Sequence, residues 1–208
     1  MVRKKTLITQ IIDLEWNMFQ NVHNVGGTAS CQEDPKTFKI MRFSQAMSWS
    51  EAALESYLGD LTEAQENKRN LLTEKYARMM KSTSPKEYYS RIDQRLPPLA
   101  PETLQLIENI ITIVMRWEEE LAIKFPNIIQ KGRPIHSSDD TMRVTSMETY
   151  MRGELATYSP RTLKLYYEHV LEQKSENING SEINLDIMVK QYGFNSLEEA
   201  NEKIKPTS

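Results

Sequence analysis

The sequence has little cysteine, glycine or histidine. Its 208 residues include one cysteine, Cys31, so neither an internal disulfide framework nor a cysteine-rich zinc site is available. Glycine occurs seven times, which suits helices, because a glycine inside a helix costs about 1 kcal/mol relative to alanine. The three histidines show no His-x-x-x-His or Glu-x-x-His spacing, so the metal motifs of helical di-iron proteins are missing.

Long apolar runs and a strong excess of one charge are missing as well. The longest apolar run, 110–115, contains a threonine and is far shorter than the roughly 20 residues of a membrane span. The net charge of −3 lacks the basic excess that is typical of proteins that bind nucleic acid. No secretory h-region follows the basic start of the chain. We therefore expect a cytoplasmic protein that binds neither nucleic acid nor a membrane.

The common cofactor and hydrolase motifs do not occur. The chain has no P-loop, no Gly-x-Gly-x-x-Gly and no Gly-x-Ser-x-Gly. We expect no cofactor. The alternative is a divalent metal held by Glu15, Asp139 or Asp140 together with a substrate phosphate. The expected partner is a small molecule, and assembly into a homo-oligomer stays open.

Apolar residues at helical spacing follow almost the whole chain, beginning with the segment 4–23. Helix starts are marked by a capping residue before a proline, as in Asp34-Pro35 and Ser159-Pro160. No segment shows sustained alternation of β-branched residues. The sequence therefore predicts an all-α fold, an irregular bundle of about seven to nine helices with no sheet.

The helix boundaries predict one core domain and a tail. We expect a helix over 35–58, stopped by Gly59 and with a break near Ser48, and a long helix that opens at Asp60. A loop of about 15 residues, 126–140, separates the expected central helix, 101–124, from a helix over 140–157. The core domain covers 1–175, and a short helical tail, 176–208, packs on it or is appended to it.

The first helical hairpin carries polar and aromatic residues on faces that should be buried. Its connecting loop of small residues, 24–32, enters a helix amino terminus, where exposed N–H groups favour an anionic ligand group. A cysteine near such a terminus can act as a nucleophile, with a histidine as its base. The candidates are Glu15, His23 and Cys31 for catalysis, and Trp16, Phe19, Arg42, Gln45 and Trp49 for substrate binding.

A structural interpretation of this hairpin stays open beside the functional one. In it, Glu15 and Arg42 form a buried ion pair, His23 finds its hydrogen-bond partners in the core, and Cys31 is a small apolar residue.

The second region rich in polar residues is the loop and helix around 131–154. His136 suits general acid–base catalysis, with an aspartate to orient it. The structural alternative is a Glu148–Arg152 pair on a helix surface and an Asp140 helix cap. The candidates are His136 for catalysis, and Arg133, Asp139, Asp140, Arg143, Glu148 and Arg152 for substrate binding.

Three segments of the amino-terminal hairpin form a distinctive block: Glu15-Trp16-Asn17-Met18-Phe19, Gly26-Gly27-Thr28-Ala29-Ser30-Cys31-Gln32 and the segment from Phe38 to Trp49. Through this block the chain resembles a bacterial family of proteins with a domain of unknown function, the one numbered four thousand one hundred and twenty-five. The resemblance covers most of the chain, and it implies a bacterial source and a self-contained domain but no catalytic residues.

Two functions fit these features. One is an enzyme that acts on a small polar or anionic metabolite by acid–base chemistry, of lyase, hydrolase or isomerase type. The other is a non-catalytic helical module that binds a small ligand or a partner helix. The enzyme requires His136 or the loop 133–143 to meet the Glu15–Arg42 cluster around one pocket.

Overall fold

The computed structural model describes residues 2–22 and 30–205. Within these ranges every regular element is helical and no strand occurs, as the sequence predicts. Short 3₁₀ segments cover Ser30–Glu33, Asp93–Arg95 and Ser137–Asp139, and a π-helical segment covers Tyr88–Ile92. The α-helices are α1 (Val2–Gln20), α2 (Pro35–Met47), α3 (Glu51–Glu66), α4 (Leu71–Thr83), α5 (Pro85–Glu87), α6 (Pro101–Lys124), α7 (Pro126–Ile129), α8 (Met147–Leu155), α9 (Pro160–Ser175), α10 (Gly180–Gln191) and α11 (Leu197–Lys203).

The described ranges thus hold eleven α-helices, slightly more than the seven to nine expected. The excess arises because α5 and α7 are single turns of three and four residues, too short to give a periodic signal in the sequence. No helix in these ranges is both long enough and apolar enough to cross a membrane.

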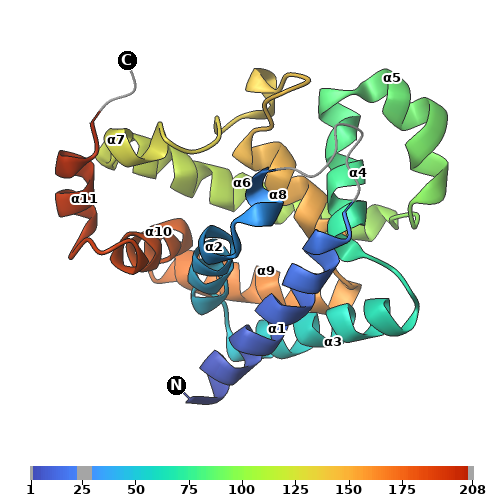
Figure 1. Cartoon of the computed structure of the whole chain (residues 1–208), viewed down its shortest axis with the longest axis horizontal. Coiled ribbons are helices and arrows are strands. Elements are labelled where there is room, and N and C mark those ends of the chain that lie inside the picture. Colours follow the sequence, from blue (N-terminus) through green and yellow to red (C-terminus); the bar gives the residue numbers. More distant parts are fainter. Residues whose placement is uncertain (1, 23–29, 206–208) are drawn as a thin grey trace.

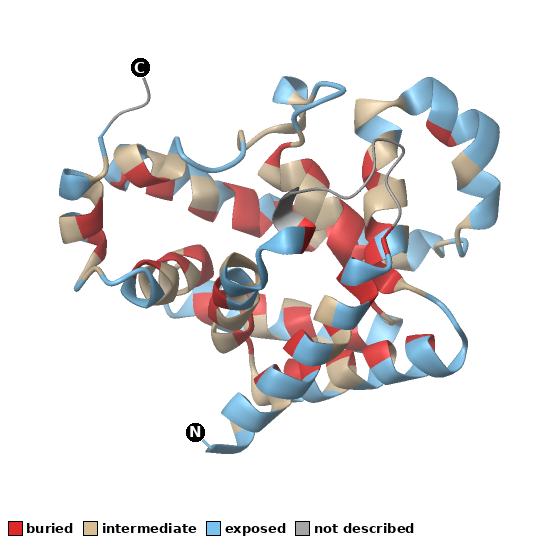
Figure 2. Ribbon diagram, viewed as in Figure 1, coloured by how far each residue is buried: buried red, intermediate tan, exposed pale blue. Residues whose placement is uncertain are grey.

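The helix α6 runs through the middle of the bundle and packs against α8, α9 and α10 (Figure 1). Its buried residues recur at helical spacing and include Ile107, Ile110, Val114 and Leu121. Buried residues gather where the long helices face one another, whereas α5 at the edge is exposed (Figure 2). The central position predicted for this helix is therefore confirmed.

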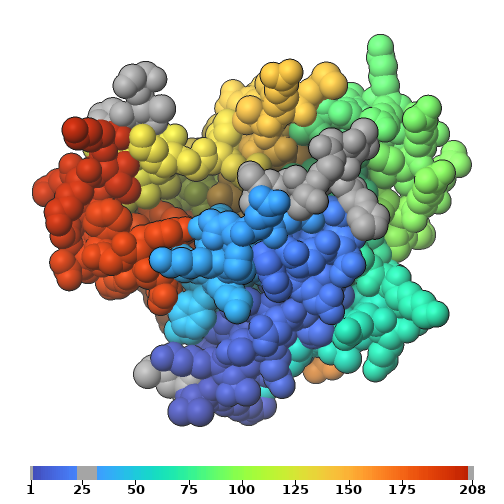
Figure 3. All heavy atoms as spheres, in the orientation of Figure 1, coloured from blue at the N-terminus to red at the C-terminus, as the bar shows by residue number. Residues whose placement is uncertain are grey.

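The tail helices α10 and α11 share a smaller apolar cluster with the end of α6 and with α7. In Figure 3 they lie against α2 and the segment 126–131, and α10 contacts α2 directly. The buried members of this cluster are Leu121, Phe125, Ile128, Leu185, Val189, Leu197 and Ala200.

The predicted stop at Gly59 is wrong, and α3 runs through this residue to Glu66. Tyr57 and Leu61 on either side are buried, and their burial outweighs the roughly 1 kcal/mol that a helical glycine costs. Asp60 does not open a new helix, because its carboxylate accepts a hydrogen bond from the backbone N–H of Ser159 at 2.9 Å.

The predicted break near Ser48 is confirmed. The helix α2 ends at Met47, and the Ser50 hydroxyl accepts a hydrogen bond from the Ala53 N–H at the start of α3. The turn between the two helices directs Trp49 into the core, where 3% of its surface is exposed.

The helix predicted to begin at Asp140 begins at Met147 instead, and Ser146 caps it. Asp140 accepts hydrogen bonds from the Ser146 N–H and from the hydroxyls of Thr149 and Ser82. Its carboxylate therefore fastens the preceding loop to both α8 and α4, in place of capping the helix from the Ncap position.

The helices α4 and α8 pack closely at Gly153. A Cβ atom at this residue would lie 2.8 Å from Cγ of Met79 and 3.0 Å from the carbonyl oxygen of Lys75. Met79 is only 6% exposed, so its side chain has little room to move aside. Because nothing larger than a hydrogen fits here, glycine sets the distance between the two helices.

Replacing Gly153 by alanine will push α8 away from α4 and lower the free energy of unfolding by about 1–3 kcal/mol. Urea denaturation followed by circular dichroism measures this loss. Gly59→Ala is the matched control, since no atom lies within 4 Å of its Cβ position and the change favours the helix. Equal stability of Gly153→Ala and the unaltered protein would contradict the close packing.

Candidate functional site

Arg42 lies at the centre of a network of buried charged side chains. Its Nε donates to Oε2 of Glu15 at 2.7 Å, and its Nη2 donates to Oε1 of the same carboxylate. Its Nη1 donates to Oε1 of Glu154 at 3.0 Å. The expected Glu15–Arg42 pair is confirmed, and a second carboxylate shares the same guanidinium.

Lys75 supplies the second positive charge of the network. Its Nζ forms an ion pair with Oε2 of Glu154 and lies 3.4 Å from the centre of the Tyr150 ring. Glu15, Lys75 and Glu154 are only 1%, 5% and 4% exposed. Two carboxylates therefore balance two cations inside the core, as the cost of burying charge requires.

Two tyrosine hydroxyls and one amide add further hydrogen bonds to the network. Tyr57 donates to Oε1 of Glu15, and Tyr158 donates to Oε1 of Glu154, each at 2.8 Å. Gln45 accepts from Nη1 of Arg42 at 2.6 Å and donates to Glu154 at 2.9 Å. The network thus joins α1, α2, α3, α4 and α8.

The protonation states in the network follow from burial and charge. Burial alone raises the pKa of Glu154, but Arg42 and Lys75 outweigh it and hold the pKa of that carboxyl well below its ordinary value. Burial, reinforced by the adjacent carboxylates, raises the pKa of Tyr57 and Tyr158 well above the usual range. Glu154 is therefore ionised, and the tyrosines remain hydrogen-bond donors.

Helical spacing places the charged residues on apolar faces. Glu15 follows Ile8 and Ile11 on the buried stripe of α1. Lys75 lies four residues from both Leu71 and Met79 on the buried stripe of α4. Each charge is thus carried into the core by apolar neighbours of its own helix.

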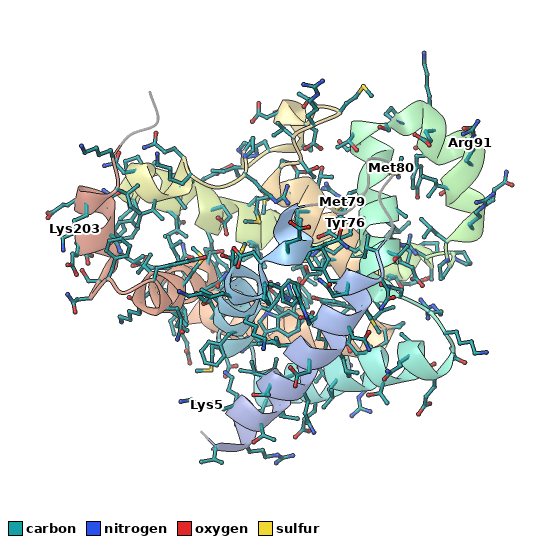
Figure 4. All side chains as sticks on the ribbon, viewed as in Figure 1. Lys5, Tyr76, Met79, Met80, Arg91 and Lys203 are labelled. Atoms are coloured by element: carbon teal, nitrogen blue, oxygen red, sulfur yellow. The ribbon has the colours of Figure 1, made fainter. Side chains whose placement is uncertain are left out.

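Trp16 and Phe19 were predicted to form the walls of this site, and the structure places them in a separate aromatic cluster. The Phe19 ring stacks on Phe38 with centroids 5.2 Å apart and lies 6.2 Å from Tyr76. Trp16 lies 5.0 Å from Phe38. Tyr76 marks this cluster on α4, near the middle of the molecule (Figure 4). Trp49, in contrast, lines a small cavity beside Glu15 and the network.

The two polar regions predicted from the sequence touch through Glu154 and Tyr150, but no residue of 131–154 lines the small cavity beside Glu15 and Arg42. The Arg133 guanidinium lies 4.7 Å from the centre of the Tyr150 ring, which Lys75 also contacts. His136 lies apart from the network, with its Nε2 3.3 Å from Oε1 of Glu119 and 45% of its side chain exposed.

The other candidates in the second region lie at the surface or hold the loop. Arg152 pairs with Glu108 and with Glu148, so the expected Glu148–Arg152 pair is confirmed. Glu148 also accepts the Ser137 N–H at 2.7 Å. Among the remaining predicted residues, Asp139 and Arg143 are exposed.

Two predicted catalytic residues cannot be placed against the network. His23 lies outside the described residues, and the side chain of Cys31 does too, although its backbone belongs to the segment Ser30–Glu33. Within the described ranges, no group of three or more His, Cys, Asp or Glu side chains is arranged to hold a metal ion.

Sequence reasoning missed four members of the network. Lys75 interrupts the apolar stripe of α4, and this signal was available. Glu154 was seen as part of a polar segment, but nothing in the sequence connected it with Arg42, 112 residues away. Tyr57 and Tyr158 gave no signal, since a buried tyrosine is an ordinary core residue.

Removing the negative charge of Glu154 will destabilise the fold strongly. Glu154→Gln leaves Lys75 without its counter-charge inside the core, which costs about 3–5 kcal/mol in the free energy of unfolding. Glu108→Gln is the control, because its pair with Arg152 is at the surface and contributes about 1 kcal/mol or less. Denaturant unfolding measures the loss in the free energy of unfolding for both variants. Similar losses would contradict the larger cost expected when Lys75 is left without its counter-charge in the core.

Asp140 will contribute a pH-dependent part of the stability. Burial raises its pKa, but hydrogen bonds from Ser82, Thr149 and Ser146 outweigh burial and lower the pKa below the ordinary 3.8. A carboxyl group whose pKa is lower in the folded protein than in the unfolded chain stabilises the fold at pH values above the unfolded-state pKa. This contribution is lost as the pH falls below that value toward the folded-state pKa. We expect Asp140→Asn to lower stability at neutral pH and to flatten its decline below about pH 5.

Denaturant titrations across that pH range measure this dependence, with Asp139→Asn as the control at an exposed neighbouring position. Identical pH profiles for Asp140→Asn and the unaltered protein would contradict the assigned role.

Comparison with known proteins supports the resemblance seen in the sequence. The family described as "Protein of unknown function (DUF4125)" matches residues 5–202, nearly the whole chain. Neither the curated proteins nor the solved structures gave a significant match. The match spans every residue of the buried network, and the chain therefore belongs to the DUF4125 family.

Proposed function

We propose that this domain binds a small polar or anionic molecule at the buried network and acts on it by acid–base chemistry without a cofactor. The observation that carries the proposal is the cluster of Glu15, Arg42, Lys75 and Glu154 in the core. Apolar residues of similar volume would stabilise a core as well or better than ion pairs do. Strongly perturbed ionisable groups are more typical of functional sites than of structural cores.

The roles follow from chemistry and exposure. Arg42 lines the small cavity beside the network, so its guanidinium is the group to which an anionic part of a ligand would bind. Glu15 is suited to accept a proton, and the adjacent Tyr57 hydroxyl holds this carboxylate in position by a hydrogen bond. These roles fit a lyase, hydrolase or isomerase step equally well.

A surface cleft supports the second candidate, a non-catalytic binding module. It has a volume of about 200 Å³ and lies between the end of α1 and the connection from α3 to α4. Its lining combines two basic residues and four amides with no carboxylate, which favours a small anion. The lining residues are Leu14, Asn17, Met18, Asn21, Gln65, Lys68, Arg69 and Asn70.

A panel of carboxylates, phosphate esters and amino acids tests both candidates by thermal stabilisation, followed by mass spectrometry for conversion of each stabilising compound. We expect Tyr57→Phe to reduce conversion at least tenfold, because it removes one hydroxyl at Glu15. Tyr166→Phe is the matched control, since this buried tyrosine packs on Trp49 outside the network.

Lys68→Gln should leave conversion unchanged, because Lys68 lines the surface cleft. One outcome would contradict the enzyme and support the binding module. In it, Lys68→Gln abolishes the thermal stabilisation by a compound, Tyr57→Phe retains it, and no compound is converted.

A further inference from the structure

The small cavity beside the network has the size and the chemistry to hold a single water molecule. Its volume is about 10 Å³, close to the minimum that one water needs. Apolar side chains close part of it, and polar groups of the network face the rest. The lining residues are Ile11, Glu15, Arg42, Gln45, Ala46, Trp49, Leu54 and Tyr57.

Trp49 brings an unused hydrogen-bond donor to this cavity. The residue is 3% exposed, and its Nε1 has no hydrogen-bond partner among the described residues. An indole nitrogen donates and cannot accept, so its partner must offer a lone pair. Buried donors without partners are rare in folded proteins, and each calls for an explanation.

Glu15 has an unused acceptor position at the same place. Its Oε1 accepts from Nη2 of Arg42 and from the Tyr57 hydroxyl, whereas its Oε2 accepts from Nε of Arg42 alone within the described part of the chain. A carboxylate offers about four lone-pair sites, two on each oxygen. One site therefore remains on Oε2.

Arg42 has one N–H group left over. A guanidinium carries five donors, of which Nε and one Nη2 hydrogen bind Glu15. The two Nη1 hydrogens bind Gln45 and Glu154. The second Nη2 hydrogen points away from the Glu15 carboxylate, at which Nε–H and the other Nη2 hydrogen are both directed, so one water cannot bind it and Oε2 together.

We propose that the cavity binds one water molecule, which accepts a hydrogen bond from Trp49 Nε1 and donates one to Oε2 of Glu15. These two partners fall within the two to four that buried waters typically have. Dry cavities are lined by apolar groups alone, whereas Glu15, Arg42 and Gln45 line this one beside its apolar residues. The inference goes beyond the proposed function, because it concerns the resting protein and holds whether or not the domain is an enzyme.

Nuclear magnetic resonance of protein with ¹⁵N-labelled tryptophan tests the proposal. The chain has three tryptophans, so three indole N–H signals are expected, and Trp49→Phe identifies the one that belongs to Trp49. In a rotating-frame Overhauser spectrum, we expect a cross-peak between this proton and water. Its sign should be that of a dipolar contact and not that of hydrogen exchange. Trp117→Phe is the matched control, and it should leave that cross-peak in place.

Absence of a dipolar contact between the Trp49 indole proton and water, in protein whose amide spectrum shows the intact fold, would overturn the proposal. A high-resolution crystal structure gives a second readout. We expect density for one atom within about 2.7–3.2 Å of both Trp49 Nε1 and Glu15 Oε2. Density bonded to Trp49 but beyond hydrogen-bond distance of Glu15 would contradict the assigned partners.

Discussion

The buried guanidinium of Arg42 is the constraint on which the rest of this structure depends. A guanidinium keeps its charge at every physiological pH, so its burial requires nearby negative charge. Burial lowers its pKa, but Glu15 and Glu154 outweigh that effect and raise the pKa well above its ordinary value. The two carboxylates belong to α1 and α8, and Lys75 of α4 then balances the second of them. One charge on α2 thereby fixes the positions of three other helices.

This arrangement separates stability from function in a specific way. Once the fold has formed, each charge depends on the others, because an unpaired ion in the core is far more costly than the pair is favourable. The complete network adds little stability compared with an apolar core, so stability alone does not account for its presence. The unused hydrogen-bonding groups of Glu15 and Trp49 belong to residues that line one cavity. Glu154 accepts hydrogen bonds on both oxygens, whereas Oε2 of Glu15 keeps an acceptor position without a partner among the described residues.

The sequence could predict what depends on local spacing. Helical periodicity gave the all-α class and the buried faces that bring Glu15 and Arg42 together, and the capping pattern at Ser48 gave the helix break there. The helix stop expected at Gly59 was wrong, because the burial of Tyr57 and Leu61 overrides the local preference against glycine. Periodicity also could not pair Lys75 with Glu154, 79 residues away, since that contact depends on how α4 and α8 pack. The predicted catalytic role of His136 remains untested, although the structure places its ring at the surface.

The central claim is that Glu154 is an ionised carboxylate, held in the core by Arg42 and Lys75. Its protonation can be followed directly by the ¹³C chemical shift of its carboxyl group as the pH is lowered from 7. The structure predicts no protonation step at or above the ordinary pKa of 4.5 while the protein remains folded. A midpoint at 4.5 or higher in the folded protein would contradict the charge-balanced network.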